Sequence, residues 1–537
     1  MTTTTTLDVV IVGAGFSGLY MLHKMRGLGF TARVYEAGGG VGGTWYWNRY
    51  PGARVDIESH EYSYSFSPEL EDDWVWTERY AAQPELLKYL NHVADRFDLR
   101  RDIQFDTRVQ AAHFDETAGR WTVTTDGGET ISARFCVMAI GCLSVTKEVD
   151  LPGAETFQGA AYHTGHWPHE GVDFSGLRVG VIGTGSSAIQ SIPQIAKQAA
   201  HLTVFQRTAN YSVPAHNAPA DPEVLAHWKA NRAELRAQAR LSPTGFLSWD
   251  PSEALAVEAT EEERQAVFED RWRRGGFAMG GAYADTLADM TANGYAAAFV
   301  ADKIRALVAD PATAEKLIPK SYPFATKRLC VDIDYHVTYN RPNVSLVDLR
   351  EEPIETITAT GVRTAAGDYA FDAIVYAIGF DAMTGPLGRI DIRGRGGLAL
   401  KDKWAEGPRT YLGLMVAGFP NLFLVTGPGS PSVLSNMVVS IEQHVDWISD
   451  CVAYLHNRQL GVMEATEEAE AGWVAHVNES ADATLYVQAN SWYLGANIPG
   501  KPRVFMPYVA GVGVYRETCD AVAAKGYEGF ALSPTPG

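Results

Sequence analysis

Residues 178–188 read Arg178-Val-Gly-Val-Ile-Gly183-Thr-Gly185-Ser-Ser-Ala188, and this stretch decides the fold. A short apolar run precedes the glycines, as in a parallel strand that is buried on both faces. Gly183 and Gly185 allow a tight turn and a close approach of the backbone to a pyrophosphate at the start of the next helix. Alanine is accepted in the third glycine position, which Ala188 occupies. The stretch therefore predicts a strand, turn and helix that bind a dinucleotide.

The N-terminal region repeats the same device. Residues 9–18 read Val9-Val-Ile-Val-Gly13-Ala-Gly15-Phe-Ser-Gly18, and residues 19–35 have the pattern of a helix followed by a second strand. Glu36 lies 18 residues after Gly18, where a carboxylate accepts hydrogen bonds from ribose hydroxyls. A glycine turn formed by chance is the alternative. The strand before it, the helix after it and the acid in register all favour nucleotide binding.

The two units differ at the position whose side chain contacts the ribose. When they are aligned by their third glycine position, Gln206 stands where Glu36 stands, and Arg207 and Thr208 follow. A carboxylate there would repel a 2′-phosphate, whereas an arginine pairs with one in bidentate geometry. The alternative is that Arg207 is only a solvated surface charge. We expect the second unit to bind NADPH rather than NADH.

Composition restricts the class of protein. The chain has 537 residues, enough for several domains, and its 46% hydrophobic and 20% charged residues are ordinary for a globular protein. The net charge of −19 argues against nucleic acid or an anionic membrane as a partner. The five cysteines are scattered without CxxC spacing, which favours reduced thiols in the cytoplasm. The N-terminal threonine run, residues 1–7, has no secretory signal and is predicted to be a disordered tail.

Two similar segments mark the domain boundaries. Residues 135–141 and 371–381 each combine an apolar strand with Ala-Ile-Gly, and they bracket the second unit. Between them the chain becomes rich in Ala, Glu and Arg at helical spacing, for example in residues 261–274 and 297–308, and strand character returns at residues 344–348. We predict an α/β fold with two Rossmann-like dinucleotide-binding domains, FAD and NADP, and a helical insertion. The expected segments are FAD domain 1–145, NADP domain 146–215, helical insertion 216–327, NADP domain 328–376 and FAD domain 377–537.

Residues 157–168 carry the pattern F-x-G-x-x-x-H-x-x-x-W-P, formed by Phe157, Gly159, His163, Trp167 and the following proline. This pattern resembles the fingerprint of type I Baeyer–Villiger monooxygenases, in particular the phenylacetone and steroid monooxygenase group, and then the cyclohexanone group. Gly42-Gly43-Thr44-Trp45 is similar to the flavin-contacting segment of FAD-dependent monooxygenases, so the resemblance places FAD in the first unit. By spacing alone, a His and an aromatic in a loop are more often packing residues. We expect His163 and Trp167 to be structural, in the linker between the nucleotide domains.

The resemblance implies that a ketone, NADPH and O2 react to give an ester or lactone through a C4a-peroxyflavin, with sulfoxidation of thioethers as a further activity. It carries the active-site roles to Asp56 and Arg328, with Lys327 near the NADPH phosphate. An always-charged guanidinium would keep the peroxide anionic and stabilise the developing oxyanion, and the carboxylate would orient it. A structural salt bridge between residues so far apart in sequence is the alternative.

The C-terminal part supplies the remaining site residues by resemblance. Residues 430–437 resemble a substrate loop, and residues 487–505 have the Gly, Pro and Asn content of a mobile lid that includes Trp492. A core tryptophan on a rigid loop is the alternative for Trp492. The FAD site is predicted at Gly13, Gly15, Gly18, Glu36, Gly43, Thr44, Trp45 and Asp56. The NADP site is predicted at Gly183, Gly185, Ser186, Ser187, Arg207, Thr208, Lys327, Arg328 and Trp492, and the substrate site at Ser432, Leu434, Met437 and Trp492.

Three rival functions remain open at this stage. A flavin monooxygenase acting on sulfur or nitrogen would lack the fingerprint and the Asp56/Arg328 pair. A pyridine-nucleotide disulfide reductase would need a close cysteine pair, and a flavin-binding scaffold without turnover would have lost Arg328 or Gly183. No metal-ligand spacing occurs. We expect a small-molecule ketone substrate, no nucleic-acid or membrane partner, and a cytoplasmic monomer or weak homo-oligomer.

Overall fold

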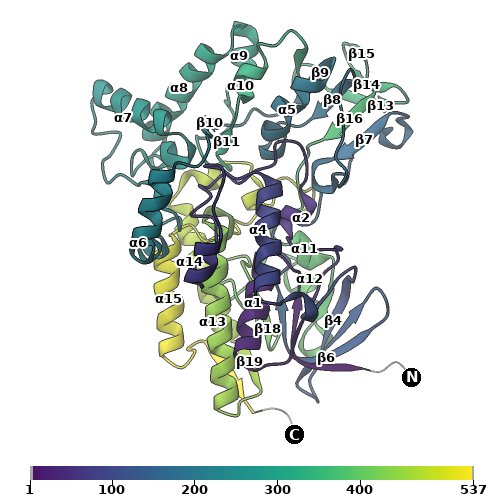
Figure 1. Ribbon diagram of the computed structural model, residues 1–537, viewed down its shortest axis with the longest axis vertical. Helices are drawn as coiled ribbons and strands as arrows, with labels where there is room; N and C mark the ends of the chain where they lie inside the picture. The colour runs from purple at the N-terminus through teal and green to yellow at the C-terminus, as the bar shows by residue number, and fades with distance from the viewer. Residues whose placement is uncertain (1–3, 535–537) are drawn as a thin grey trace.

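The computed structural model describes residues 4–534, which form two large β-sheets and three smaller ones with helices packed around them (Figure 1). Strand β1 (Thr5–Val12) lies inside the first sheet, parallel to both of its neighbours. Val9 and Ile11 belong to one core cluster, and Val10 and Val12 to another, because successive side chains of a strand point to opposite faces. Both faces of this strand are therefore buried, as its apolar sequence predicts.

The first sheet contains strands from both ends of the chain. Its order is β17-β4-β5-β6-β1-β2-β3, and β18 pairs with β6. The bounds are β2 Ala32–Tyr35, β3 Ile103–Gln104, β4 Val109–Asp115, β5 Arg120–Thr125, β6 Thr130–Met138, β17 Asp391–Arg393 and β18 Leu422–Leu424. Helix α1 (Phe16–Gly27) connects β1 to β2 and starts at the first glycine turn.

The second sheet is parallel throughout, in the order β12-β9-β8-β16-β7. Its strands are β7 Ala160–His163, β8 Arg178–Ile182, β9 His201–Gln206, β12 Val344–Asp348 and β16 Ala373–Tyr376. Helix α5 (Ser186–Gln198) follows β8 at the second glycine turn. A three-stranded antiparallel sheet of β13 Ile354–Thr358, β14 Gly361–Thr364 and β15 Gly367–Ala370 lies between β12 and β16 in the chain. The predicted α/β class is confirmed.

The two glycine turns pack in the same way against the two Ala-Ile-Gly segments. Gly13 and Gly183 have φ of +100° and +113°, which favours glycine. A β-carbon on Gly13 would lie 2.6 Å from the carbonyl oxygen of Ala139, and one on Gly183 would lie 2.3 Å from that of Ala377. Each turn is thus pressed against the end of a neighbouring parallel strand, and the internal repeat seen in the sequence is also a repeat of structure.

The region predicted to be helical consists mainly of α6 Pro222–Leu241, α7 Glu261–Arg274, α8 Met290–Leu307 and α9 Pro311–Leu317. Figure 1 shows α7, α8 and α9 at the top and upper left of the molecule, near the second sheet, whereas α6 runs down toward α15. Helix α7 has the bounds that its spacing predicts, and a capping box of Thr260 and Glu263 fixes its start. Helix α8 begins earlier than predicted because the side chain of Asp289 caps it.

Three helices of the C-terminal part pack beside the first sheet (Figure 1). They are α13 Met437–Asn457, α14 Glu467–Asp482 and α15 Val512–Ala524, and a short hairpin of β19 Val462–Ala465 and β20 Phe530–Ser533 accompanies them. Val438, Val445 and Ile448 of α13 are fully buried in the main core cluster, which also contains residues of α1. Both described chain ends lie at the end of the molecule formed by the first sheet.

The prediction of a disordered N-terminal tail is wrong for Thr5–Leu7. These residues belong to β1 and pair with residues 131–133 of β6. β-branched threonines fit a pleated strand, and the length of β6 offers them a partner. The first three residues of the predicted tail lie outside the described part of the chain.

We predict that Gly183→Ala and Gly185→Ala separate stability from cofactor binding. The first change places a β-carbon against Ala377 at positive φ, a conformation that alone costs about 1–3 kcal/mol, so the thermal midpoint of the cofactor-free protein should fall. The second change meets no atom within 4 Å, so it should leave that midpoint unchanged and weaken NADPH binding. Differential scanning fluorimetry and NADPH titration test this. Equal thermal midpoints for the two variants would contradict it.

Candidate functional site

Asp56 and Arg328, which are 272 residues apart in the chain, form a bidentate ion pair. Asp56 lies in the loop between α2 (Thr44–Trp47) and α3 (Pro68–Asp73), and Arg328 lies two residues before the short strand β11 (Cys330–Asp332). Arg328 Nε donates to Asp56 Oδ2 at 3.0 Å, and Nη2 donates to Oδ1 at 2.8 Å. About a quarter of each side chain stays exposed, 24% and 27%, so a bound molecule can reach the pair.

Two further contacts fix the guanidinium of Arg328. Nη1 donates to the carbonyl oxygen of Val433 at 2.7 Å, and the guanidinium carbon lies 4.8 Å from the centre of the Phe277 ring. Burial lowers the pKa of Arg328, but the carboxylate of Asp56 more than offsets this, so the pKa is raised and the group stays charged. A guanidinium has five N–H groups, and the contacts to Asp56 and Val433 leave at least one of them for a ligand.

The first glycine turn has the shape of a nucleotide cradle. Gly43, which precedes α2, would place a β-carbon 3.0 Å from the α-carbon of Gly15, so two bare backbones face each other there. Glu36 follows β2 directly, and its two carboxylate oxygens accept hydrogen bonds from the N–H groups of Ala14 and Gly38, each at 2.7 Å. Carboxylate oxygens have further lone pairs, so Glu36 can still accept from ribose hydroxyls.

The helices at the two glycine turns begin without a side-chain cap. Helices α1 and α5 start after Gly15 and Gly185 and carry no acidic residue in the first turn. Five other long helices and the shorter α9 start at a side-chain cap: α6 at Asp221, α7 at Thr260, α8 at Asp289, α9 at Asp310, α13 at Asn436 and α14 at Thr466. Helix α4 (Gln83–Arg96) also lacks a side-chain cap, but a proline in its first turn removes one of the N–H groups. Helix α15 also starts after a glycine, but its first N–H groups donate to carbonyls of residues 242 and 243. Free N–H groups and the helix dipole at α1 and α5 suit phosphate, so both turns fit a dinucleotide.

Three cations gather beside the second turn. The pKa of Lys327 is lowered, first by burial and then by repulsion from Arg207, and the pKa of Lys147 is lowered by the same two causes. None of the three forms an ion pair with a residue in the described range 4–534. The ammonium of Lys327 lies 4.3 Å from the centre of the Tyr322 ring. Such a cluster is unfavourable without an anion, and a 2′-phosphate would supply one.

The other residues predicted at the second nucleotide lie on the same rim. Ser186 and Ser187 open α5, and their hydroxyls contact the Cys330 thiol at 3.3 Å and the Thr164 hydroxyl at 3.2 Å. Thr208 follows Arg207, and its carbonyl oxygen accepts a hydrogen bond from the hydroxyl of Thr184 in the turn. The backbone N–H groups of this turn, rather than the serine hydroxyls, are thus the free donors.

The predicted substrate loop and lid meet in one apolar cluster. Val433 and Met506 are buried in it, and Leu434, Met437 and Trp492 are partly buried against it. Ser432, predicted beside them, is fully buried and donates from Oγ to the carbonyl oxygen of Thr426 at 3.3 Å. Because Val433 also accepts a hydrogen bond from Arg328, the cluster adjoins the ion pair.

The predicted lid, residues 487–505, is docked in this structure by a few polar contacts. Lys501 Nζ lies 2.7 Å from Asp381 Oδ1 and also donates to the carbonyl oxygen of Ala382. Asn497 Nδ2 donates to the carbonyl oxygen of Phe380 at 2.7 Å. The lid thus contacts the segment where the chain returns from the second sheet to the first.

The fingerprint residues differ from their predicted position in a linker. His163 is the last residue of β7, the edge strand of the second sheet. The Phe157 ring occupies the space where a β-carbon of Gly159 would lie, at 2.5 Å, and Trp167 is buried against Tyr162 and Phe174. The turn after β7 still contacts the two chain segments that connect the sheets. A β-carbon on Gly165 in this turn would lie 2.3 Å from Thr146 and 2.8 Å from Phe380.

The side chain of His163 holds this turn. Its Nδ1 accepts a hydrogen bond from the N–H of Gly165 at 3.0 Å. Burial, followed by repulsion from His166, lowers the pKa of His163 to about 4, so it is neutral near pH 7. These contacts are those of a packing residue and not of a proton shuttle.

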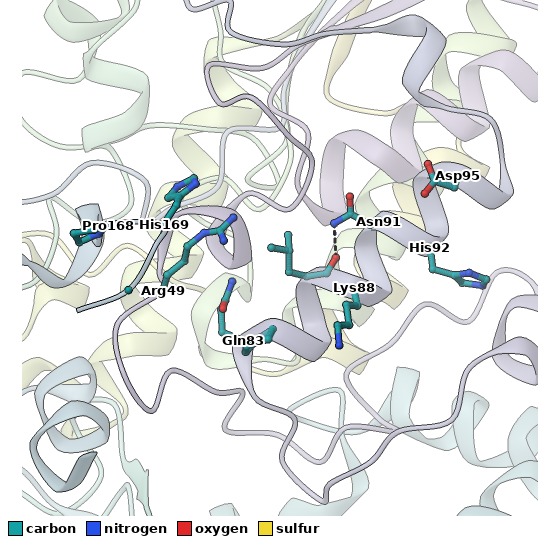
Figure 2. A pocket seen from close by; sticks show the side chains of 11 residues that line it. Arg49, Gln83, Lys88, Asn91, His92, Asp95, Pro168 and His169 are labelled. Atoms are coloured by element: carbon teal, nitrogen blue, oxygen red, sulfur yellow. Dashed lines mark hydrogen bonds between the residues drawn. The ribbon is translucent and has the colours of Figure 1, made fainter. Parts of the chain in front are cut away.

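A large hollow elsewhere is not the reaction site. It has a volume of about 680 Å³ and is lined by one side of α4 (Gln83–Arg96), by Arg49 and by residues near Pro168. Figure 2 shows Lys88, His92 and Asp95 spread along α4, with Arg49 and His169 across from them. A large pocket is the default candidate for a ligand site, but neither Asp56 nor Arg328 lines this one.

Within residues 4–534, the structure has neither a cluster of metal ligands, nor a membrane-spanning helix, nor a disulfide. No three His, Cys, Asp or Glu side chains come together there as a metal site. None of the helices in this range has the length and apolar character that a bilayer crossing requires. All five cysteines lie in this range, are buried and are not bonded to one another.

Comparisons with known proteins agree with this geometry. The family model described as pyridine nucleotide-disulphide oxidoreductase matches residues 10–238. A Baeyer–Villiger monooxygenase of Pseudooceanicola batsensis is 45% identical over 524 residues, which cover 97% of this chain and 95% of that protein. The chain belongs to the Baeyer–Villiger monooxygenase family. The family predicted from the fingerprint is confirmed.

Two solved structures of similar proteins carry cofactors. An oxidised steroid monooxygenase bound to NADP is 56% identical, with a TM-score of 0.95, and the match covers 98% of this chain and 100% of that one. OTEMO in complex with FAD and NADP is 40% identical, with a TM-score of 0.95 and coverage of 99% and 100%. The Baeyer–Villiger fold therefore extends over essentially the whole chain.

Several groups at this candidate site carry little or no signal in the sequence. The carbonyl of Val433 is a backbone group, and no sequence pattern could have assigned it to Arg328. Phe277 lies in a Gly-rich turn with no motif of its own. Lys147 carries a weak signal, because it follows the first Ala-Ile-Gly segment closely and bears an unbalanced positive charge.

The cation cluster predicts the choice of nicotinamide cofactor. Arg207→Ala should raise KM for NADPH about tenfold or more and leave KM for NADH nearly unchanged, because only NADPH has the 2′-phosphate. Steady-state kinetics with both cofactors measure this. Lys229→Ala is the control, because Lys229 is an exposed lysine of α6 that pairs with Asp72 of α3. Equal changes for NADPH and NADH in Arg207→Ala would contradict the assignment.

Proposed function

We propose that the protein is an FAD- and NADPH-dependent Baeyer–Villiger monooxygenase that inserts one oxygen atom of O2 beside a ketone carbonyl to give an ester or lactone. The bidentate pair of Asp56 with Arg328, open to solvent at one side, carries the proposal. The two uncapped glycine turns fit FAD and NADPH. When bound, NADPH would supply the electrons and the reduced flavin the activation of dioxygen, and the remaining tasks belong to the protein.

The first task is to stabilise negative charge on oxygen. Arg328 cannot lose its proton, and its remaining N–H group points away from the acceptors that hold it. We propose that this group stabilises the anionic oxygen that attacks, and then the carbonyl oxygen of the ketone as charge develops there. Asp56 and the Phe277 ring keep the guanidinium in place, so little reorganisation is needed during the reaction.

The second task is to hold NADPH in position. We propose that Gly183, Gly185, Ser186 and Ser187 present backbone N–H groups to its pyrophosphate. Arg207, with Lys327 and Lys147, would pair with the 2′-phosphate, and Thr208 would line the same rim. Gly13, Gly15, Gly18, Glu36, Gly43, Thr44 and Trp45 would hold FAD in the first turn.

The third task is to admit an apolar ketone and exclude water. The cluster that contains Leu434, Met437 and Trp492, with Ser432 beside it, adjoins Arg328, and we propose that the docked lid closes it. We propose that Trp492 contacts both nicotinamide and substrate. A thioether would enter the same apolar site, so sulfoxidation is proposed as a further activity.

We propose the domain division expected from the sequence: an FAD domain of residues 1–145 and 377–537, an NADP domain of 146–215 and 328–376, and a helical insertion of 216–327. The membership of the two sheets supports it. We further propose a cytoplasmic enzyme, monomeric or weakly associated, with no nucleic-acid partner. Its net charge of −19 and its five thiols without a disulfide support this.

Arg328→Ala tests the proposed chemistry. We expect ester formation to fall by at least about a hundredfold, the loss typical for one oxyanion donor, whereas NADPH still bleaches the flavin band at 450 nm. Gas chromatography over linear, aryl and cyclic ketones measures product, and stopped-flow absorbance measures flavin reduction. Arg363→Ala, which breaks an exposed pair with Asp368, is the control. A normal ester yield from Arg328→Ala would overturn the role of this arginine.

A further inference from the structure

The turn that follows β18 carries two residues in an unusual backbone conformation. Thr426 and Ser432 have φ of +57° and +43°, values that L-residues rarely adopt. Val425 still bonds to β6, with its N–H 3.1 Å from the carbonyl oxygen of Met138. The turn therefore starts at the carboxyl ends of parallel strands, beside Ala139 and the Gly13 turn, where this type of fold binds its nucleotide.

His444, on helix α13, holds the first of these residues. Its Nδ1 accepts a hydrogen bond from the backbone N–H of Thr426 at 2.8 Å. His444 is fully buried and Thr426 is 3% exposed, so water cannot replace this acceptor. A buried N–H group without a partner is costly, and strained φ values persist only where surrounding contacts hold them. The imidazole is thus the contact that keeps the Thr426 amide in place.

The same turn leads to the active-site arginine in two more steps. Ser432 Oγ donates to the carbonyl oxygen of Thr426 at 3.3 Å, so the two strained residues are tied to each other. The next residue, Val433, accepts the hydrogen bond from Arg328 Nη1 at 2.7 Å. A shift of Thr426 would therefore move the carbonyl that orients the guanidinium.

The ring of His444 can act only as an acceptor at this position. Burial, and next repulsion from Arg516, lower the pKa of His444 to about 3. The imidazole is thus neutral at the pH values at which enzymes work, and the proton sits on Nε2 because Nδ1 accepts. Protonation of Nδ1 would remove the acceptor that Thr426 needs.

We propose that His444 is a positioning residue, which sets Arg328 through the turn formed by residues 426–433 without touching the reacting atoms. The inference deepens the proposed function and rests on it, because it assigns Arg328 to the stabilisation of negative charge. It predicts that the acceptor at Nδ1, and not the volume or charge of the imidazole, is what matters for the yield of oxygenated product.

Two substitutions separate the acceptor from the volume. His444→Asn places an amide oxygen where Nδ1 stands and keeps the hydrogen bond from Thr426. His444→Phe fills the space with a ring that cannot accept. Ser449→Ala is the matched control, because Ser449 is a buried polar residue of the same helix whose hydroxyl only bonds to Val445 within the helix.

Two measurements report on the proposal. Hydrogen exchange of the Thr426 amide, by mass spectrometry of the FAD-loaded enzyme, should be faster in His444→Phe by roughly 5- to 100-fold, the factor for one lost buried hydrogen bond, and near wild type in His444→Asn. The ratio of ester formed to NADPH consumed should fall in His444→Phe, with the difference appearing as hydrogen peroxide. His444→Asn should restore this ratio, and Ser449→Ala should leave both readouts unchanged.

Several outcomes would overturn the proposal. These are an unchanged product ratio in His444→Phe, a ratio in His444→Asn as low as in His444→Phe, or a similar loss in Ser449→Ala. If His444→Phe does not fold, Ser432→Ala tests the second step of the path, and a wild-type product ratio there contradicts the inference. If the wild-type enzyme forms no ester from any ketone, the proposed function fails, while the exchange rates still report whether His444 holds Thr426.

Discussion

The ion pair of Asp56 with Arg328 is the interaction on which the rest of the structure depends. A guanidinium that is largely buried must keep its charge and needs a carboxylate and other acceptors in return. The two partners come from distant parts of the chain: Asp56 follows the first nucleotide turn, and Arg328 follows the helices α6 to α9. The pair can form only when both nucleotide units are folded and correctly placed, so the chemistry is tied to the architecture.

The nucleotide turns show a second constraint, because the fold leaves groups that only a ligand can satisfy. Helices α1 and α5 lack the side-chain caps that most of the longer helices in the described range possess. Their glycines permit close approach of backbone to backbone, as between Gly15 and Gly43. At the ribose end of the second site, the cations around Arg207 need an anion in the same way. Pyrophosphate and 2′-phosphate would relieve these costs, so cofactor binding and folding should stabilise each other.

Much of this could be predicted from the sequence, where local rules decide the structure. The strand at residues 344–348, the bounds of α7 and the position of Glu36 follow from apolar periodicity, capping and spacing from a glycine turn. The pair of Asp56 with Arg328 required a family resemblance, because no local rule connects residues so distant in the chain.

The groups that the sequence missed act through tertiary contact. The carbonyl of Val433 serves Arg328 because the turn after β18 is held in a rare conformation, which residue types alone do not reveal. Phe277 and Lys147 gain their roles from neighbours that are far away in the chain. The prediction of disorder is wrong for Thr5–Leu7 because β6 is long enough to pair with these residues, and the length of a partner strand is a non-local property.

A crystal structure of the enzyme with FAD and NADP+ bound would test the central claim most directly, through the distance between the Arg328 guanidinium and the reactive face of the isoalloxazine ring. We expect the guanidinium, still paired with Asp56, to lie within contact distance of that face or of the nicotinamide above it. A guanidinium that points away from both rings, in a structure with the lid docked and both cofactors ordered, would contradict it.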